Sequence, residues 1–359
     1  MNSIYVLDKT LTLQGVIDNY ESIIWRPAYS DVGDFEIYVK ASVETLKLLQ
    51  KDFYVVRNSD ISVNDGVTTY KNVMVINNIR LTTDIENGDH LTVTGRELKY
   101  LLHRRIVWQQ TNLSGTAENA IRRLITENAI SPSDSKRVIA DLVLGAPSGL
   151  TDSINKQLTG EYLDEAITEI CNTYNYGWDL FIRDRKLTVE IYKGLDRSYS
   201  QSERPFVVFS EYFDNLFSTE YELNSEAYAT TNLVAGEGEG SERITTTVGA
   251  DYTGLERYEV YTDARDISQN KDSENEIALS DYLLLLQAKG VEVLSELVMT
   301  EGFTGELLSD MTFKYRKDFY LGDIVTVISQ YGLSKNVRVM SAIESEDSGG
   351  AKLIPVFNL

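Results

Sequence analysis

The sequence contains few residues whose type and spacing could support catalysis. Its two histidines, His90 and His103, are not accompanied by Cys or acidic residues at the spacings of metal ligands. Cys171 lies on the apolar face of a predicted helix, where a thiol usually packs as a small hydrophobic group. We therefore expect no catalytic residues, no metal site and no cofactor.

Acidic residues are the other group that could do chemistry. Two carboxylates that flank a glycosidic bond can hydrolyse it. The chain has 55 Asp and Glu residues, so no particular pair can be singled out. A carboxylate-dependent cell-wall glycan or peptidoglycan hydrolase stays an alternative, and a pocket with two carboxylates, one of raised pKa, would favour it.

Aromatic residues suggest a second alternative. They make up 10% of the chain, and 22 of them are tyrosines. Exposed Trp or Tyr rings gathered on one face would indicate a carbohydrate-binding module. Tyrosines on strands more often pack against cross-strand neighbours, which makes this reading weaker.

A glycine-rich run superficially resembles a phosphate-binding loop. It contains Gly236, Gly238 and Gly240, separated by two glutamates that would repel phosphate. Neither a parallel βαβ unit nor a following Lys-Ser/Thr accompanies the run. It predicts the tip of a flexible hairpin instead.

The charge is strongly negative and unevenly distributed. The formal net charge is −21, and residues 211–310 hold 22 acidic and five basic residues, which gives −17 in that segment alone. Duplex DNA is bound mainly by Lys and Arg that neutralise phosphates, so we expect no such binding. The N-terminus lacks a signal-peptide pattern, and no apolar run approaches the length that spans a bilayer. We expect no membrane insertion.

One residue pattern occurs twice in the same order. It consists of Lys-Asp-Phe-Tyr, then Lys-Asn-Val, then two further apolar residues. The first copy is Lys51, Asp52, Phe53, Tyr54, Lys71, Asn72, Val73, Val75 and Ile79; the second is Lys317, Asp318, Phe319, Tyr320, Lys335, Asn336, Val337, Val339 and Ile343. The repeat predicts two β domains of one topology, with the paired valines facing inward in both copies.

The spacing of short alternating strands favours a β-rich α+β protein, with strands that would form a small barrel or sandwich. We predict a helix with Ser114 as its N-cap, and a long helix over residues 272–298 that is interrupted at Gly290. The expected domains are a first barrel at 1–100, an α/β domain at 101–205, a second barrel at 206–250 and 299–359, and a helical insertion at 251–298.

Three stretches together resemble a known family. They surround the positions Gly95, Arg96, Arg104, Arg105, Gly236, Gly238, Gly240, Gly322 and Asp323. The combination is similar to the tail-hub (baseplate hub) proteins of long-tailed phages that infect Gram-positive bacteria, which in turn resemble the hub of contractile tails. The resemblance covers nearly the whole chain and implies two similar β-barrel domains plus two smaller α/β or helical inserted domains.

The resemblance implies a virion structural protein at the tail tip or baseplate, made in the host cytoplasm. Three copies would form a pseudo-sixfold ring that joins the tail tube to the tip. The implied partners are the other two copies of a homotrimer, a distal tail or tail-tube ring, the tape-measure protein, and tip, fibre or receptor-binding proteins. Genomic DNA would pass through the ring without stable binding, and a negatively charged lining would not retain it.

One departure from the family pattern concerns the C-terminal side. Many hub proteins of this kind carry a long extension with a hydrolase or a fibre, whereas this sequence stops at Leu359. We expect wall-degrading and receptor-binding activity to lie on other subunits.

The charge distribution generates a prediction about DNA. The purified protein should not retain duplex DNA at physiological salt, because residues 211–310 offer few cations to replace the phosphate counterions. An electrophoretic mobility shift assay at micromolar protein measures this. A shift that weakens steeply with added salt would contradict the expectation.

Overall fold

The computed structural model describes all residues except Met1, Asn87, Asp272, Ser273, Asn275, residues 307–311, Gln330 and Leu359. Ser218, Glu301 and residues 303–306 are described by their backbone alone. Strands predominate over helices, so the β-rich α+β class predicted from the sequence is confirmed. No described helix combines the length and the apolarity that crossing a membrane requires.

The N-terminal strands form an antiparallel set in the order β3-β4-β9-β8-β5, extended by β1 and β2. Their bounds are β1 (Ile4–Leu7), β2 (Leu13–Ile17), β3 (Tyr20–Arg26), β4 (Asp34–Lys40), β5 (Tyr54–Arg57), β8 (Met74–Thr82) and β9 (His90–Glu97). Helix α1 (Val43–Leu48) has Ser42 as its N-cap, and the Ser42 hydroxyl accepts a hydrogen bond from the Thr45 N–H. Alternate residues such as Ile37, Val55 and Ile76 are buried in one core.

The C-terminal strands form a second antiparallel set in the order β16-β20-β23-β22-β21, with β15 beside β21. Their bounds are β15 (Val208–Ser210), β16 (Phe217–Asn224), β20 (Thr300–Glu306), β21 (Ile324–Ile328), β22 (Ser334–Asp347) and β23 (Gly350–Asn358). Val325, Val337, Val339 and Phe357 lie in its core.

The two sets have the same topology. In each, the first and second strands along the chain are neighbours, the fifth pairs with the second, and the fourth lies between the fifth and the third. A β-bulge occupies the same place in the fourth strand, at Asn77 in β8 and at Met340 in β22. The chain therefore contains one five-stranded unit twice. Closed barrels, which the sequence predicted, are not confirmed: the described strands form open sheets.

The repeated sequence pattern marks this duplication but is out of register with it. Ile76 N donates to Phe53 O and Asp52 N donates to Ile76 O, while Val339 N donates to Asp323 O and Gly322 N donates to Val339 O. Ile76 is therefore the structural equivalent of Val339, whereas the sequence pattern aligns Val339 with Val75.

This one-residue offset changes which side the valines face. Val337 and Val339 point into the core of their own five-stranded unit, but Val73 and Val75 point away from theirs. The prediction of equivalent inward valines is wrong, since Met74 and Ile76 occupy those places. The second Lys-Asp-Phe-Tyr block, residues 317–320, also precedes β21 instead of opening it.

An α/β part follows the first unit. Its five-stranded sheet has the order β11-β14-β13-β7-β6, and β10 and β12 form a separate pair. The bounds are β6 (Ile61–Asn64), β7 (Val67–Tyr70), β10 (Thr111–Thr116), β11 (Leu142–Leu144), β12 (Ser153–Leu158), β13 (Gly177–Arg183), β14 (Lys186–Tyr192), α2 (Ala117–Ile125) and α3 (Leu163–Tyr174). Residues 61–70 fall within the predicted first barrel at 1–100, but their strands belong to this sheet, because β7 pairs with β13 and β6 pairs with β7. The N-cap of α2 is Thr116, not Ser114, because Ser114 pairs within β10.

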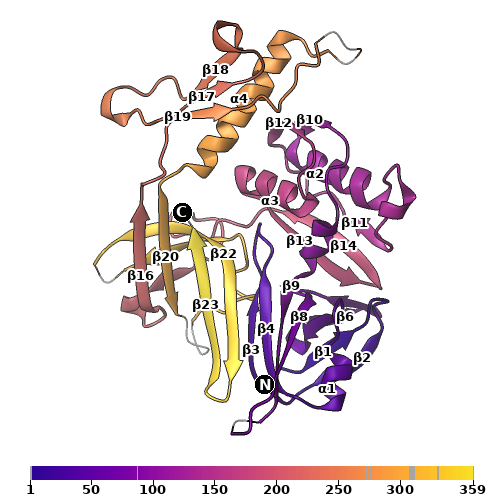
Figure 1. Cartoon of the computed structure of the whole chain (residues 1–359). Helices are drawn as coiled ribbons and strands as arrows, with labels where there is room; N and C mark the ends of the chain where they lie inside the picture. Colours follow the sequence, from indigo (N-terminus) through magenta and orange to yellow (C-terminus); the bar gives the residue numbers. More distant parts are fainter. Residues whose placement is uncertain are drawn as a thin grey trace.

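A second part is inserted between β16 and β20. It contains β17 (Thr231–Ala235), β18 (Thr245–Val248), β19 (Glu259–Asp263) and α4 (Leu279–Glu296), which lie together at one end of the molecule (Figure 1). Residues 231–248 therefore belong to this three-stranded sheet and not to the second five-stranded unit. Helix α4 continues through Gly290, where a Cβ would lie 2.7 Å from Val234 and Val248 side chains. Close packing, and not interruption, explains that glycine.

The close pairing of β8 with β9 at Gly95 generates a stability prediction. A Cβ at Gly95 would lie 1.9 Å from Val75 O, so Gly95→Ala should destabilise the fold by about 1–3 kcal/mol through overpacking. Gly302, inside β20, has no atom of the described residues within 4 Å of such a Cβ and serves as the control. Urea unfolding of both variants measures the difference, and equal effects would contradict it.

Candidate assembly interface

The two five-stranded units are joined edge to edge within the chain. Residues 344–347 of β22 pair antiparallel with residues 22–25 of β3, which makes one sheet of 13 strands among the described residues. The contact extends beyond the strands, since Tyr29 N donates to Met340 O at 2.7 Å and Ala28 forms a bridge with Ser341. Figure 1 shows β22 and β3 side by side at the middle of the sheet.

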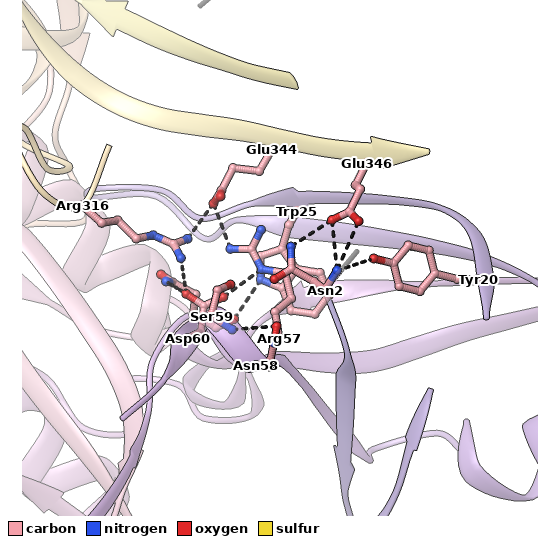
Figure 2. A network of polar contacts seen from close by, with 11 residues as sticks. Asn2, Tyr20, Trp25, Arg57, Asn58, Ser59, Asp60, Arg316, Glu344 and Glu346 are labelled. Atoms are coloured by element: carbon pink, nitrogen blue, oxygen red, sulfur yellow. Dashed lines mark hydrogen bonds and ion pairs between the residues drawn. The ribbon is translucent and has the colours of Figure 1, made fainter. Parts of the chain in front are cut away.

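A buried ion network crosses this junction (Figure 2). Arg57 is 2% exposed, with Nε 2.8 Å from Asp60 Oδ2 and Nη2 2.8 Å from Glu344 Oε1. Arg316 contacts the same two carboxylates, at 2.6 Å from Glu344 and in a shorter contact with Asp60. Two cations and two anions thus neutralise one another where β5, β22 and the segment before β21 meet.

The network is further organised by an aromatic ring and an amide. The Arg57 guanidinium lies 5.2 Å from the Trp25 ring centroid, in cation–π geometry. Trp25 Nε1 donates to Asn72 O, and Asn72 Nδ2 donates to Asp60 Oδ1 at 2.6 Å. Burial alone would lower the pKa of Arg57, but the charges of Asp60 and Glu344 outweigh it and raise that pKa.

A second polar contact lies farther along the same pair of strands. Asn2 N donates to Tyr20 Oη at 3.0 Å, and Asn2 Nδ2 donates to Glu346 Oε2 at 2.9 Å. Burial, together with the nearby Glu346 carboxylate, raises the pKa of Tyr20 to about 12. These contacts attach the N-terminal residues to β22 and extend the junction.

Gly322 and Asp323, two of the family-motif residues, lie at the same junction. A Cβ at Gly322, whose φ is +86°, would lie 2.1 Å from the Tyr29 ring. Asp323 is buried and accepts from Leu195 N and Arg197 Nε, both at 2.8 Å. This motif therefore fixes Tyr29 of the first unit and the connection at 195–197 against the second unit.

The other family-motif residues are spread over the molecule. Gly95 and Arg96 lie on β9, and Arg104 Nη2 is 2.5 Å from Asp52 Oδ1. Arg105 Nε donates to Arg137 O. The run from Gly236 to Gly240 connects β17 to β18, and Gly236 leaves room for the Tyr282 hydroxyl. The structure does not bring these positions together in one site.

The candidate chemical groups occupy structural positions. His103 Nδ1 lies 3.0 Å from Asp164 Oδ1, and its ring stacks between Tyr100 and Tyr162. His90 Nε2 lies 2.9 Å from Glu21 Oε1. Cys171 is fully buried in an apolar core, which confirms its predicted packing role and raises the pKa of its thiol.

One carboxylate pair stands out, but it is held by cations. Glu169 on α3 and Glu292 on α4 both contact Lys156, and Lys289 also contacts Glu292. Burial and the neighbouring Glu292 raise the pKa of Glu169. Neither glutamate lines the hollow of about 640 Å³ over β3, β4, β8 and β9, or the smaller one beside β22. The cluster fastens α4 to the α/β part.

Sequence reasoning missed the four residues of the ion network. A signal was present for one of them, because Arg57 ends the apolar run 54–56 and a charge in a buried strand requires a partner. One carboxylate partner of Arg57, Asp60, is three residues away, but the other, Glu344, is 287 positions away. No local pattern could identify Glu344, or Arg316, which shares both carboxylates.

Comparison with known proteins identifies a family that matches nearly the whole chain. A family model described as Siphovirus ReqiPepy6 Gp37-like protein matches residues 3–357. No curated protein matches the sequence.

Three solved structures share the fold over nearly the whole chain. A tail protein from Neisseria meningitidis MC58 is 14% identical, with a TM-score of 0.59 over 100% of this chain and 96% of that one. The 43 kDa tail protein of prophage MuSo2 from Shewanella oneidensis is 12% identical, with a TM-score of 0.59 and coverages of 99% and 98%. Prophage tail protein gp18 from Listeria monocytogenes EGD-e is 12% identical, with a TM-score of 0.54 and coverages of 99% and 94%.

The buried network generates a prediction about the junction. Asp60→Asn leaves the buried Arg57 and the partly exposed Arg316 with one carboxylate, so it should destabilise the protein by about 3 kcal/mol. Glu127→Gln, in an exposed helical pair with Arg123, is the control and should change stability by less than roughly 0.5 kcal/mol. Urea unfolding followed by tryptophan fluorescence measures both. A neutral Asp60→Asn would show that the network contributes little.

Proposed function

The chain belongs to the Siphovirus ReqiPepy6 Gp37-like family, and from that premise we propose that it is the structural hub of a phage tail tip or baseplate. In this role three copies form a ring that joins the tail tube to the tip and lets the genome pass during infection. The fold shared with three tail proteins, two of them from prophages, supports the assignment to a tail.

The duplicated five-stranded unit is the observation that carries this proposal. A tail tube with sixfold symmetry needs six similar faces, and three chains with two units each supply them. The parts inserted in the two units differ, so the same ring offers threefold symmetry on another side. In this ring the two five-stranded units would take the places of the two predicted barrels, although their described sheets are open.

The partners follow from this position. One face of the ring would contact a distal tail or tail-tube ring and the tape-measure protein, and the other would contact tip, fibre or receptor-binding proteins. The excess of acidic residues at 211–310 would discourage retention of DNA in transit.

We propose a non-enzymatic role. The histidines and the thiol are engaged in packing, and the carboxylate of raised pKa, Glu169, lies in an ion cluster outside both described hollows. Turnover of cell wall by the purified protein, abolished by one Asp or Glu substitution, would instead establish the hydrolase alternative. Neither that activity nor carbohydrate binding is favoured by a described feature.

Oligomeric mass tests the hub. We expect the purified protein to have three times the 40.5 kDa mass of the chain, because three two-unit copies close a ring. Multi-angle light scattering after size exclusion, over a range of concentrations, measures this mass. A stable dimer or tetramer would contradict the proposal.

A further inference from the structure

The first five-stranded unit leaves one flank of a strand open. β5 pairs with β8 at Met74 and Val75, and the last contact is between Ile76 and the segment 52–53. Beyond that point, the described partners of β8 lie only on the β9 side.

The second unit has the same flank, and there it is covered. The equivalent part of β22 pairs with β3 and with Pro27–Tyr29 of the first unit. The strand equivalent to β3 in the second unit is β16, which ends the 13-strand order at the edge farthest from β2 (Figure 1). One molecule thus carries one completed junction and the two separate halves of another.

We propose that β16 of one copy pairs antiparallel with residues 78–82 of β8 in a neighbouring copy, in the manner of the β3·β22 junction inside the chain. This inference rests on the proposed trimeric hub and names the surfaces that close it. Three such contacts and three internal junctions alternate around the ring.

The internal junction also gives the register. Across the first unit, Trp25, Phe35, Gly95 and Ile76 lie in one row of paired residues; across the second, the row is Tyr221, Phe303, Phe357 and Val339. Tyr221 is therefore equivalent to Trp25. Counting past the shared bulge, Leu81 is equivalent to Glu344. Because Glu344 pairs with Trp25, Leu81 should pair with Tyr221.

The side chains in this register are complementary, although the register itself follows from backbone pairing alone. Leu81 faces Tyr221 and Ile79 faces Leu223, and all four are large apolar side chains that are 37–56% exposed in the single chain. They share one side of the new pair of strands and would be covered there. Exposed apolar residues at both edges are a known aggregation hazard, which the contact removes.

The opposite side of the same pair places Arg80 against Glu222. Both side chains are exposed, and neither has an ion-pair partner among the described residues. Opposite charges directly across a strand pair are favourable, whereas a slip of one residue would set Leu81 against a glutamate. Polar and apolar positions thus select the same register.

A charge exchange tests the contact in the full-length protein. Arg80→Glu sets two acids opposite each other and should raise the dissociation constant of the trimer at least about tenfold. Glu222→Arg should do the same, and the double variant Arg80→Glu/Glu222→Arg should restore the wild-type value. Arg183→Glu, at an exposed arginine on β13, is the matched control and should have no effect. Sedimentation velocity over a dilution series measures the dissociation constants.

A pair of cysteines tests the register directly. Arg80→Cys with Glu222→Cys should form disulfides between chains on oxidation, because six strands separate β8 from β16 in the sheet of one chain. Arg80→Cys with Tyr221→Cys places the thiols on opposite faces and should link poorly. The native Cys171 is buried and does not compete.

The outcomes separate the two proposals. A trimer that is insensitive to both charge reversals and gives no Arg80→Cys/Glu222→Cys link would overturn the edge pairing and leave the hub intact. A protein that stays monomeric at its highest soluble concentration and gives no link would overturn both. Restoration by the charge exchange together with the specific link would establish the contact.

Discussion

The hydrogen-bonded junction between β3 and β22 is the constraint on which the architecture depends. It converts two separate five-stranded units into one continuous sheet and fixes their relative orientation. The backbone pairing alone would allow slippage, but Glu344 pairs with both Arg57 and Arg316, and a shifted register would deprive the buried Arg57 of this partner. Charge burial therefore specifies register here, and Gly322 with Asp323 fixes the neighbouring loop around Tyr29.

The two units differ less in their strands than in what is inserted between them. In the first unit the connection from the first to the second strand is short, whereas in the second unit it holds β17, β18, β19 and α4. The connection from the third to the fourth strand is the longer one in the first unit, because it holds β6 and β7, which join the α/β sheet. The proposed hub would require such a common framework with unequal insertions, because it would meet sixfold symmetry on one side and threefold symmetry on the other.

Sequence patterns predicted the strand-rich class and the burial of Cys171, because alternation and helical faces are local properties. They also detected the duplication, yet the matching residues were displaced by one position in β8 and by more before β21. A slip of one residue moves every side chain to the other face, so Val73 and Val75 fill a different core from Val337 and Val339. The open sheets, Arg57 with its partners, and the continuity of α4 through Gly290 depend on contacts between distant segments, which no local pattern contains.

The junction also has a consequence for the order of events during synthesis. Residues 22–25 of β3 leave the ribosome more than 300 residues before their partners at 344–347. At elongation rates of roughly 5–20 residues per second, this delay lasts about 15–60 s. During this delay, the edge of β3 lacks β22, and Arg57, which is buried in the finished protein, lacks Glu344. The rest of the first unit can already fold. Until β22 has been synthesised, the exposed edge of β3 can pair with another nascent chain on the same message. The speed of translation therefore affects the yield of correctly folded protein.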